Sequence, residues 1–470
     1  MTRTSENLAR WSAGAWCGAE PPADFTGVFH DTREVLPGGL YVAIKGDRLD
    51  GHDFVERAFE AGASGAVVSR EYAVRHTHFS GALLCVDDTR RALLELAAGY
   101  RKTLPGRIIG LTGSVGKTMV KEMLGDVLAC AGHVARTRGN RNNDLGLPLS
   151  LLSMSAEDAY GVFEVGINHP GEMAPLARVL QPEWAVITLV GAAHAGFFTS
   201  EEQIAREKAE LFRALPEEGT AVLDIDQRWA ETMLQGISCR RLAVSSKGRT
   251  DADYSLLQSD EVETLRLRDR ANDRTLTCRM PLPGLHIKQN ALLALAVGLS
   301  LGVDAEAACM AIASFKPVGM RWQVEHVDGV CFVNDAYNAN PLSMRAALGT
   351  FAELPGCGAK WLVLGGMGEL GAAERSEHES LGTALATGPW TGLICVGEMA
   401  KGIADGAARA GMASGRISCC ADAYGAARLL REYRLAEKDA VLLKASRSVQ
   451  LETVLSFFKE QVQGPTHVEP

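Results

Sequence analysis

The sequence IIGLTGSVGKT, residues 108–118, predicts how the centre of this chain folds. An apolar run leads into a glycine-rich segment, and apolar residues then recur at the spacing of one helix face, namely Val120, Met123, Leu124, Val127 and Leu128. A strand, a glycine-rich turn and a helix together bind phosphate well, because converging backbone N–H groups and the helix N-terminus favour an anion. We therefore predict a nucleotide-binding loop here.

Within this loop, each residue type has an expected task. Lys117 is expected to reach the β- and γ-phosphates of ATP, and the Thr118 hydroxyl to ligate Mg²⁺. The turn around the phosphates consists of Gly113, Ser114, Val115 and Gly116. The loop departs from the strict consensus, which has a glycine where this chain has Leu111. An ordinary glycine-rich turn is the alternative, and the strand-to-helix context favours nucleotide binding.

Outward from the loop, short apolar runs alternate with helical patterns along the chain. The predicted strands lie at 40–44, 66–68, 83–86, 107–112, 162–165, 184–189, 220–224, 330–333, 361–364, 393–396 and 440–444. This alternation predicts an α/β protein with parallel sheets and crossover helices. Residues 260–283 break the rhythm with period-two alternation, which predicts a small antiparallel hairpin. We expect three domains, with residues 1–104, 105–317 and 318–470.

Composition narrows the class of protein. The chain has 470 residues, of which 47% are hydrophobic and 22% are charged, and this composition is typical of a protein with two or three globular domains. Its net charge of -9 argues against nucleic acid or an anionic membrane as partner. Its eleven cysteines show no CxxC pair, which favours free thiols in a reducing compartment. No apolar run reaches the length of a membrane span, and the N-terminus has no apolar signal core. We predict a cytoplasmic protein.

Polar side chains at strand ends are the next candidates. Glu164 ends a strand and suits a second magnesium ion, with a solvated strand end as the alternative. His194 follows another strand, where a hydrogen-bonded histidine is the alternative to a ligand. Lys208 lies in a charged helix at 201–212, whose pattern by itself indicates a surface lysine. Asn290 opens an apolar helix, and as an isolated residue it is interpreted as a helix cap.

A second polar group follows the strand at 330–333. Asn340 before Pro341 predicts a helix start, with the asparagine as cap and the proline in the first turn. That local role does not explain why so many polar residues crowd one strand end, namely Asn334, Asp335, Tyr337, Asn338 and Asn340. Their number predicts a binding loop.

Taken together, these segments resemble the Mur ligase family of amide-forming ATPases in peptidoglycan synthesis. The resemblance runs along nearly the whole chain and is carried by GNRNNDLGLPLSLL (139–152), EVGINHPGE (164–172), AAHAGFF (192–198), NDAYNANPLSM (334–344) and GMGELG (366–371). It implies three domains: a small α/β domain for a UDP-linked substrate, a central P-loop ATPase domain, and a C-terminal Rossmann-like domain. The N-terminal segment 31–63 carries the match to the substrate domain.

The resemblance also implies roles for single residues. Glu164, His194 and Lys208 match ligands of a second magnesium ion, with Lys208 carbamylated, which replaces the surface-lysine interpretation. The implied nucleotide contacts are Asn290, Arg321, Asp335, Tyr337 and Asn338. The implied substrate contacts are Thr32, Arg33, Asn142, Asn143, Asn338, Asn340, Lys444, Ser446 and Arg447. Three residues depart from the family pattern: Ile167, Gly366 and Ala445 stand where relatives have a small residue, an aspartate and a glycine.

The implied reaction is ATP-dependent and ADP-forming. The substrates are UDP-N-acetylmuramoyl-tripeptide and D-alanyl-D-alanine, joined through an acyl phosphate with two Mg²⁺ ions, Lys117 and Arg321 neutralising charge. Because an acyl phosphate hydrolyses readily, we expect the region beyond 318 to close over the site, and we expect a monomer. The alternatives are another Mur-type or folylpolyglutamate-synthase-like ligase, a generic P-loop kinase, and a nucleotide-binding scaffold without catalysis.

Overall fold

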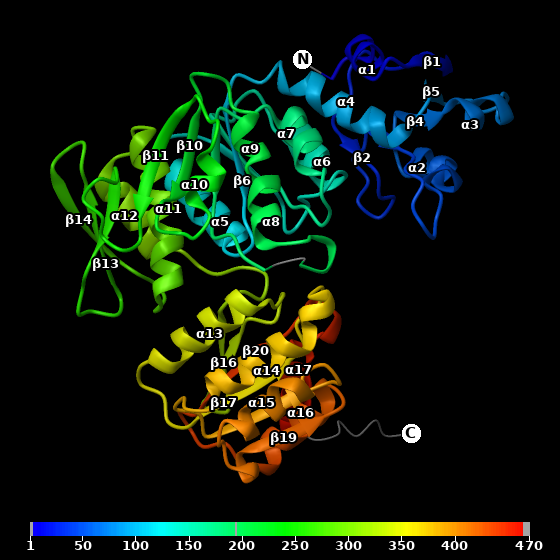
Figure 1. Ribbon diagram of the computed structural model, residues 1–470. Coiled ribbons are helices and arrows are strands. Elements are labelled where there is room, and N and C mark those ends of the chain that lie inside the picture. Colours follow the sequence, from blue (N-terminus) through cyan, green and yellow to red (C-terminus); the bar gives the residue numbers. More distant parts are fainter. Residues whose placement is uncertain (1–2, 193–194, 464–470) are drawn as a thin grey trace, which may run out of the picture.

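The computed structural model describes residues 3–192 and 195–463, and it contains three β-sheets that follow one another along the chain (Figure 1). The N-terminal region, in blue, lies beside the central region, in cyan and green. The C-terminal region, in yellow to red, lies below them in this view. The α/β class expected from the alternating pattern is confirmed. The domain boundaries proposed at 104 and 317 stay predictions.

The N-terminal sheet has the strand order β1-β5-β4-β3-β2. Its strands are β1 (Ala15–Gly18), β2 (Val28–Phe29), β3 (Leu40–Val42), β4 (Gly65–Ser69) and β5 (Ala82–Val86). Helices α1 (Ser5–Ser12), α2 (Val55–Glu60), α3 (Arg70–Arg75) and α4 (Thr89–Arg101) and the 3₁₀ turn η1 (Gly51–Phe54) accompany it. The pairs from β2 to β5 are parallel, and β1 adds an antiparallel edge.

The central sheet has nine strands in the order β14-β13-β12-β11-β10-β9-β6-β8-β7. The strands are β6 (Arg107–Thr112), β7 (Val134–Arg136), β8 (Tyr160–Glu164), β9 (Trp184–Ile187), β10 (Thr220–Asp224), β11 (Arg240–Ser245), β12 (Tyr254–Leu257), β13 (Thr264–Asp269) and β14 (Arg274–Arg279). The pairs from β7 to β12 are parallel. The chain order reverses around β6, so the switch point of the sheet lies there.

The hairpin predicted within residues 260–283 is confirmed. Strands β13 and β14 pair antiparallel from Thr264 and Arg279 to Asp269 and Arg274. Leu265 and Leu267 face the core while their arginine neighbours point outward, as the alternating pattern requires.

Helices connect and cover the central strands. They are α5 (Lys117–Ala129), α6 (Gly146–Ser153), α7 (Met173–Leu180), α8 (Glu201–Lys208), α9 (Glu210–Arg213), α10 (Ala230–Leu234), α11 (Leu285–Ser300), α12 (Ala305–Ala313) and the turn η2 (Ala195–Phe197). The apolar face predicted for α5 is buried. Two expected helices differ in extent. The helix at 201–212 is divided into α8 and α9, and α11 begins at Leu285, so Asn290 lies inside a helix and is not its cap.

The C-terminal sheet has the order β15-β16-β20-β17-β18-β19. Its strands are β15 (Gln323–Val327), β16 (Val330–Asn334), β17 (Lys360–Gly365), β18 (Gly392–Val396), β19 (Ile417–Cys420) and β20 (Ala440–Lys444). Its helices are α13 (Pro341–Glu353), α14 (Glu374–Leu385), α15 (Lys401–Arg409), α16 (Ala423–Glu432) and α17 (Thr453–Gln463), with turns η3 (Gly371–Ala373), η4 (Ser414–Arg416) and η5 (Arg447–Val449). All pairs except β15 with β16 are parallel.

Two observations concern the cysteines and the membrane. The sulfur atoms of Cys17 and Cys85 are joined, as are those of Cys278 and Cys309, so the expectation that every cysteine is free is wrong for these four. Within residues 3–192 and 195–463, no helix is long and apolar enough to cross a membrane.

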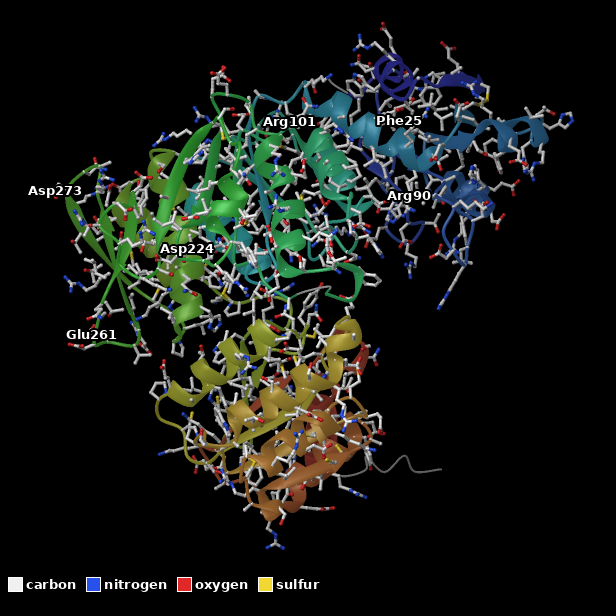
Figure 2. All side chains as sticks on the ribbon, in the orientation of Figure 1. Phe25, Arg90, Arg101, Asp224, Glu261 and Asp273 are labelled. Atoms are coloured by element: carbon white, nitrogen blue, oxygen red, sulfur yellow. A yellow bond between two sulfur atoms is a disulfide. The ribbon has the colours of Figure 1, made fainter. Side chains whose placement is uncertain are left out.

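Helix α4 fixes the N-terminal sheet to the central one. Its apolar side shares one core cluster with strands of both sheets, including Val67, Leu96 and Phe163. Arg101, labelled in Figure 2 where α4 ends, is 8% exposed and donates hydrogen bonds to the Leu180 carbonyl at 3.2 Å and to a Glu183 carboxylate oxygen at 2.8 Å. Buried polar groups need such partners, so Arg101 anchors the helix against α7 and β9.

We predict that Arg101→Met lowers the free energy of unfolding by about 1–3 kcal/mol, because the buried Leu180 carbonyl loses its donor while the apolar stem remains. The control is Arg91→Met on the same helix, whose guanidinium is exposed and pairs only with Glu95. It should change stability by less than about 0.5 kcal/mol. Urea unfolding followed by fluorescence measures both, and equal effects would contradict an anchoring role.

Candidate active site

The phosphate loop lies where β6 meets α5, at the switch point of the central sheet. Gly113 has φ +152° and Gly116 has φ +91°, which a residue with a side chain rarely adopts. A Cβ at Gly116 would also lie 2.5 Å from the Asn290 Oδ1 atom. Leu111, the departure from the consensus, is a buried residue of β6, so the turn itself begins after Thr112 and keeps its glycines.

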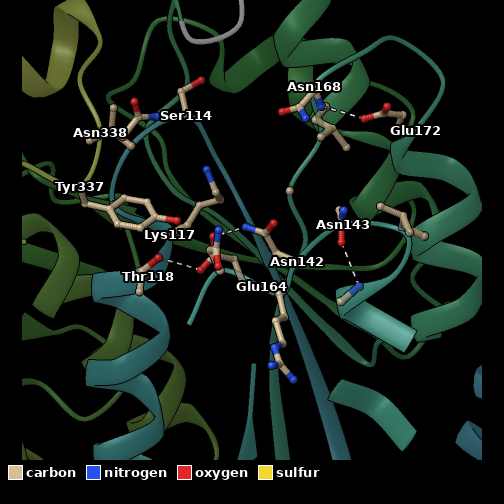
Figure 3. Close-up of a pocket in the computed structure, with 18 of the residues that line it drawn as sticks. Ser114, Lys117, Thr118, Asn142, Asn143, Glu164, Asn168, Glu172, Tyr337 and Asn338 are labelled. Carbon is tan, nitrogen blue, oxygen red and sulfur yellow. Dashed lines mark hydrogen bonds between the residues drawn. The ribbon is translucent and has the colours of Figure 1, made fainter. Parts of the chain in front are cut away.

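Glu164 is the centre of a short hydrogen-bond network (Figure 3). Its carboxylate accepts the Thr118 hydroxyl at 2.8 Å on one oxygen and the Asn142 amide at 2.7 Å on the other. It is 2% exposed, so the alternative of a solvated strand end is wrong. Parallel pairing of β6 with β8 places Glu164 beside Leu111, one strand away from the phosphate loop. The arrangement leaves a hydroxyl and a carboxylate facing one another, both oxygen ligands that Mg²⁺ prefers.

Two lysines, Lys117 and Lys208, lie near this carboxylate. The Lys117 amine donates to the Gly113 carbonyl at 2.9 Å, and its pKa is lowered, first by burial and further by Arg321, against the attraction of Glu164. Lys208 is 2% exposed, so the surface position suggested by its helix pattern is wrong. Burial and the positive charge of Lys117 hold the pKa of Lys208 well below its usual value. A site with more cationic groups than carboxylates suits a polyphosphate.

The C-terminal region contributes a loop that faces the phosphate loop. The Lys444 amine is 3% exposed and donates to Asp335 Oδ2 at 2.6 Å and to the Asn338 carbonyl at 3.1 Å. The Arg321 guanidinium lies over the Tyr337 ring, 3.7 Å from its centroid. Together these contacts hold the polar loop after β16 in one conformation, with its side chains directed at the nucleotide-binding end.

The helix start predicted at Asn340 is confirmed. Its side chain caps α13 by accepting the Ser343 N–H, and the Ser343 hydroxyl accepts the backbone N–H of Asn340, which completes a capping box. Ser446, 5% exposed, accepts the Gly368 N–H at 2.6 Å and so fixes a neighbouring loop. Arg447 is half-exposed and pairs with Glu452.

The departures from the family pattern follow local packing. A Cβ at Gly366 would lie 2.7 Å from the Met399 Cβ atom, so the position of a relative's aspartate is filled by a neighbour. The Ala445 methyl is buried and would lie 2.6 Å from a Cβ at Gly365, so the glycine there leaves room for it. Ile167 is buried, belongs to the apolar cluster shared by the N-terminal and central sheets, and lines the cavity. All three departures therefore lie in packed surroundings.

A cavity of 990 Å³ joins these groups and is lined by all three regions. It brings together most of the predicted residues: Ser114, Val115, Gly116, Lys117, Thr118, Asn142, Asn143, Glu164, Asn290, Arg321, Asp335, Tyr337, Asn338, Asn340 and Lys444. Its wall does not include Thr32, Arg33, Gly113, Lys208, Ser446 or Arg447. His194 lies outside the described residues. Arg33 is 82% exposed and pairs with Asp31, so its contact with a nucleotide-sugar stays a prediction.

Three further residues that the sequence did not single out also line the cavity: His30, Arg90 and Arg141. Arg90 pairs with Asp144, and Arg141 pairs with Glu34, so ion pairs connect the N-terminal region to the loop after β7. Arg90 follows the strand ending at Val86, and the strand-end reasoning applied to Glu164 would have found it. No sequence signal marks Arg141 as facing the N-terminal region, because that contact joins residues far apart in the chain.

Lys121 is a further residue that the sequence did not indicate. It is fully buried on α5, one turn after Lys117, and its amine donates to the Thr137 carbonyl at 2.6 Å. The Thr137 hydroxyl accepts the backbone N–H of Glu164 at 2.9 Å. A continuous chain of contacts thus runs from Lys121 to the backbone of Glu164, and we infer that Lys121 helps to position this residue.

The side chains at the phosphate loop are of the types that bind a nucleotide and a hard cation such as Mg²⁺. The Thr118 hydroxyl and the Glu164 carboxylate are oxygen donors at the phosphate loop, and the amines of Lys117 and Lys208 lie near the carboxylate. Within the part of the chain that the structure describes, no group of three or more His, Cys, Asp or Glu side chains is arranged to hold a metal ion. Magnesium sites that bind nucleotides are commonly completed by phosphate oxygens and water.

We predict that Lys121→Met weakens binding of Mg²⁺–ATP about tenfold or more, because the loop carrying Thr137 and the carboxylate of Glu164 lose their support. Isothermal titration measures the affinity, and the exposed Lys102→Met serves as control and should bind as the unaltered protein does. A variant that melts at a lower temperature but binds nucleotide normally would restrict Lys121 to a purely structural role.

Comparisons with known proteins agree with this architecture. Residues 24–101 match the profile described as "Mur ligase family, catalytic domain", residues 111–298 the "Mur ligase middle domain", and residues 320–447 the "Mur ligase, glutamate ligase domain". Among curated proteins, the UDP-N-acetylmuramoyl-tripeptide–D-alanyl-D-alanine ligase of Bacillus subtilis is 35% identical over 99% of both chains. The ligase of the same name from Escherichia coli is 34% identical over 93% of this chain and 95% of its own.

Solved structures give the same result. MurF from Acinetobacter baumannii superposes with a TM-score of 0.87 at 30% identity, covering 97% of this chain and 98% of its own. MurF ligase from Thermotoga maritima in complex with ADP superposes with a TM-score of 0.79 at 29% identity, covering 93% of this chain and 98% of its own. The resemblance inferred from the sequence motifs is confirmed, and the chain belongs to the Mur ligase family.

Proposed function

We propose that this protein uses ATP to join D-alanyl-D-alanine to UDP-N-acetylmuramoyl-tripeptide, forming ADP, phosphate and the UDP-linked pentapeptide of peptidoglycan synthesis. The observation that carries the proposal is the cavity lined by all three regions, whose wall includes the phosphate loop and the side chains of Arg90, Arg141 and Arg321. The relatives that share its whole length carry the name of this activity. Because ATP is a substrate, we place the reaction in the cytoplasm.

ATP is proposed to bind where the central and C-terminal regions meet. The phosphate loop and Lys117 would receive the phosphates, and Arg321, beside Tyr337 on the opposite wall, would approach them from the other region. The ADP complex of the Thermotoga maritima relative supports a nucleotide in this fold. Thr118 and Glu164 would hold Mg²⁺, which supplies charge neutralisation for phosphoryl transfer when bound.

The chemistry begins at a carboxylate, which is a poor electrophile. The γ-phosphoryl group moves to an oxygen of the tripeptide carboxylate, and ADP is released from the phosphorus. The amine nitrogen of D-alanyl-D-alanine then attacks the acyl carbon, phosphate departs with the former carboxylate oxygen, and the nitrogen loses a proton. Lys117 and Arg321 stabilise the negative charge that develops on the transferring group, and closure of the C-terminal region would exclude water.

Other functions explain less of the site. A ligase for a single amino acid would use the same phosphate loop, but the relatives most similar in length and identity are named for the dipeptide. A silent scaffold would not require buried amines beside Glu164, since burying charged or reactive groups costs free energy. The identity of the third peptide residue, the number of Mg²⁺ ions and the monomeric state stay predictions.

We predict Mg²⁺-dependent phosphate release from ATP only when UDP-N-acetylmuramoyl-tripeptide and D-alanyl-D-alanine are both present, with the pentapeptide detected by mass spectrometry. The Lys117→Ala variant, which loses the amine at the phosphates, should turn over at least about 100-fold more slowly. Measurable ATP binding without turnover for any tripeptide and dipeptide would refute the proposal and favour the scaffold.

We also propose that Lys208 carries a carbamate in the active protein. Only an uncharged amine adds CO₂, and burial beside Lys117 lowers the pKa of Lys208 in the direction that leaves it uncharged. The product is an anion, and it would supply an oxygen ligand near Glu164 where the unmodified amine supplies none. The modification would therefore add a negative charge close to this carboxylate.

For Lys208→Met we predict opposite effects on activity and stability. Turnover should fall by at least about 100-fold, because a metal-ligating group is lost. In CO₂-free buffer the free energy of unfolding should rise by about 1–3 kcal/mol, because a buried amine is removed.

The stability gain has a predictable pH dependence. The unfolded chain binds a proton on Lys208 more tightly than the folded chain does, so the gain from Lys208→Met is largest at low pH and disappears as the pH rises past the unfolded value near 10.5. Urea unfolding between pH 6 and pH 10 measures it. The control is Arg206→Met on the same helix, which is exposed and pairs with Glu202. A Lys208→Met variant with normal turnover would contradict the carbamate proposal.

A further inference from the structure

A pair of cysteines lies at the edge of the C-terminal sheet, apart from the cavity. Cys395 on β18 and Cys419 on β19 are direct partners in the parallel register of these strands. Partners in neighbouring strands point to the same face of a sheet, with backbones about 4.8 Å apart. That spacing lies within the range of about 4.4–6.8 Å that a disulfide requires between Cα atoms. Both cysteines are unbonded in the structure.

The two thiols differ in access and in charge. Cys395 is 1% exposed, whereas Cys419 is exposed on β19, the last strand of the sheet. Interaction with the neighbouring Cys395 thiol lowers the pKa of Cys419 to about 7, whereas interaction with Cys419, together with burial, raises the pKa of Cys395. Of the charged groups on the covering helix α15, Lys401 lowers the pKa of Cys419 and Asp405 raises it. The accessible thiol of Cys419 therefore ionises more readily than usual, whereas the buried thiol of Cys395 keeps its proton.

We propose that Cys419 and Cys395 form a thiol pair that peroxide oxidises to a disulfide between β18 and β19. Nothing in the ligase reaction uses either sulfur, and Figure 1 shows β19 toward the end of the C-terminal region that lies away from the central sheet. The pair is therefore a modification site separate from the ligase chemistry. Its reactant is a small peroxide that can reach the exposed sulfur.

The chemistry proceeds in two steps that balance. The Cys419 thiolate attacks one peroxide oxygen, the O–O bond breaks, and the departing hydroxide takes a proton to become water, which leaves a sulfenic acid on Cys419. The Cys395 sulfur then attacks the Cys419 sulfur, the S–O bond breaks, and hydroxide leaves with the Cys395 proton as a second water. The two thiols are oxidised by two electrons and the peroxide is reduced by the same two.

The neighbouring Cys420 does not serve as the partner in this scheme. It is the next residue along β19, so its side chain points to the opposite face of the sheet. Its sulfur lies 3.4 Å from the Asp422 carbonyl, and burial raises its pKa to about 11. The geometry therefore favours Cys395 over the cysteine adjacent in sequence.

The experiment treats the full-length protein with one equivalent of hydrogen peroxide, blocks the remaining thiols with iodoacetamide, and maps disulfides by peptide mass spectrometry. We expect a new 395–419 linkage with loss of two hydrogens. In Cys395→Ser, peroxide should leave a sulfenic acid on Cys419 that a dimedone probe captures. Before oxidation, Cys419 should react with iodoacetamide at pH 7 about tenfold faster than an ordinary exposed thiol.

The matched control is Cys130, which is exposed and unbonded but has no cysteine partner across a strand. Cys130→Ser should form the new linkage as the unaltered protein does, and Cys419→Ser should not form it. Linkage of Cys419 to Cys420 in place of Cys395 would overturn the proposal, as would alkylation of Cys419 no faster than that of Cys130. Because these readouts are covalent and do not use turnover, they are independent of the proposed ligase function.

Discussion

The arrangement of the site depends on one constraint: amines that are shielded from water need a compensating anion. Lys117 and Lys208 both lie near a single carboxylate, Glu164, and Lys208 is almost fully buried. Burial disfavours their charged forms, and each raises the cost of charging the other. Three features reduce this cost. The pKa of both amines is lowered, and the Lys117 amine donates a hydrogen bond to the Gly113 carbonyl. The cavity beside them is open, so phosphates can enter. The amines that would bind a polyanion are therefore already positioned before the ligand arrives.

The scaffold around this carboxylate is built from contacts between distant parts of the chain. Lys121 supports Thr137, Thr137 receives the backbone of Glu164, and Glu164 in turn orients Thr118 and Asn142. On the facing wall, Lys444 holds the loop that begins at Asp335. Each wall is thus fixed by its own buried lysine. The two walls belong to different sheets, and each of these hydrogen-bond networks lies within its own region.

Much of this arrangement could be predicted from local patterns. The period of the apolar residues predicted β6, β10, the β13–β14 hairpin and the buried face of α5, because alternation and helical spacing are local properties. The helix start at Asn340, with the asparagine as cap, was predictable for the same reason. Local patterns were misleading where burial depends on a distant partner. Lys208 has the neighbours of a surface helix and yet is buried, and Asn290 was assigned to a helix start although α11 begins at Leu285.

The sequence by itself determined the α/β class, the phosphate loop and the family, since these rest on residue order over short stretches. Only the tertiary structure decided that Lys121 supports Glu164, that Arg90 and Arg141 face the same cavity as Lys117, and that Cys395 pairs with Cys419 and not with a neighbour in sequence. The physical reason is that strand register and the packing of helices on sheets bring together side chains far apart along the chain. The free energy of such contacts depends on burial and on the sum of surrounding charges, and neither is encoded within any single motif.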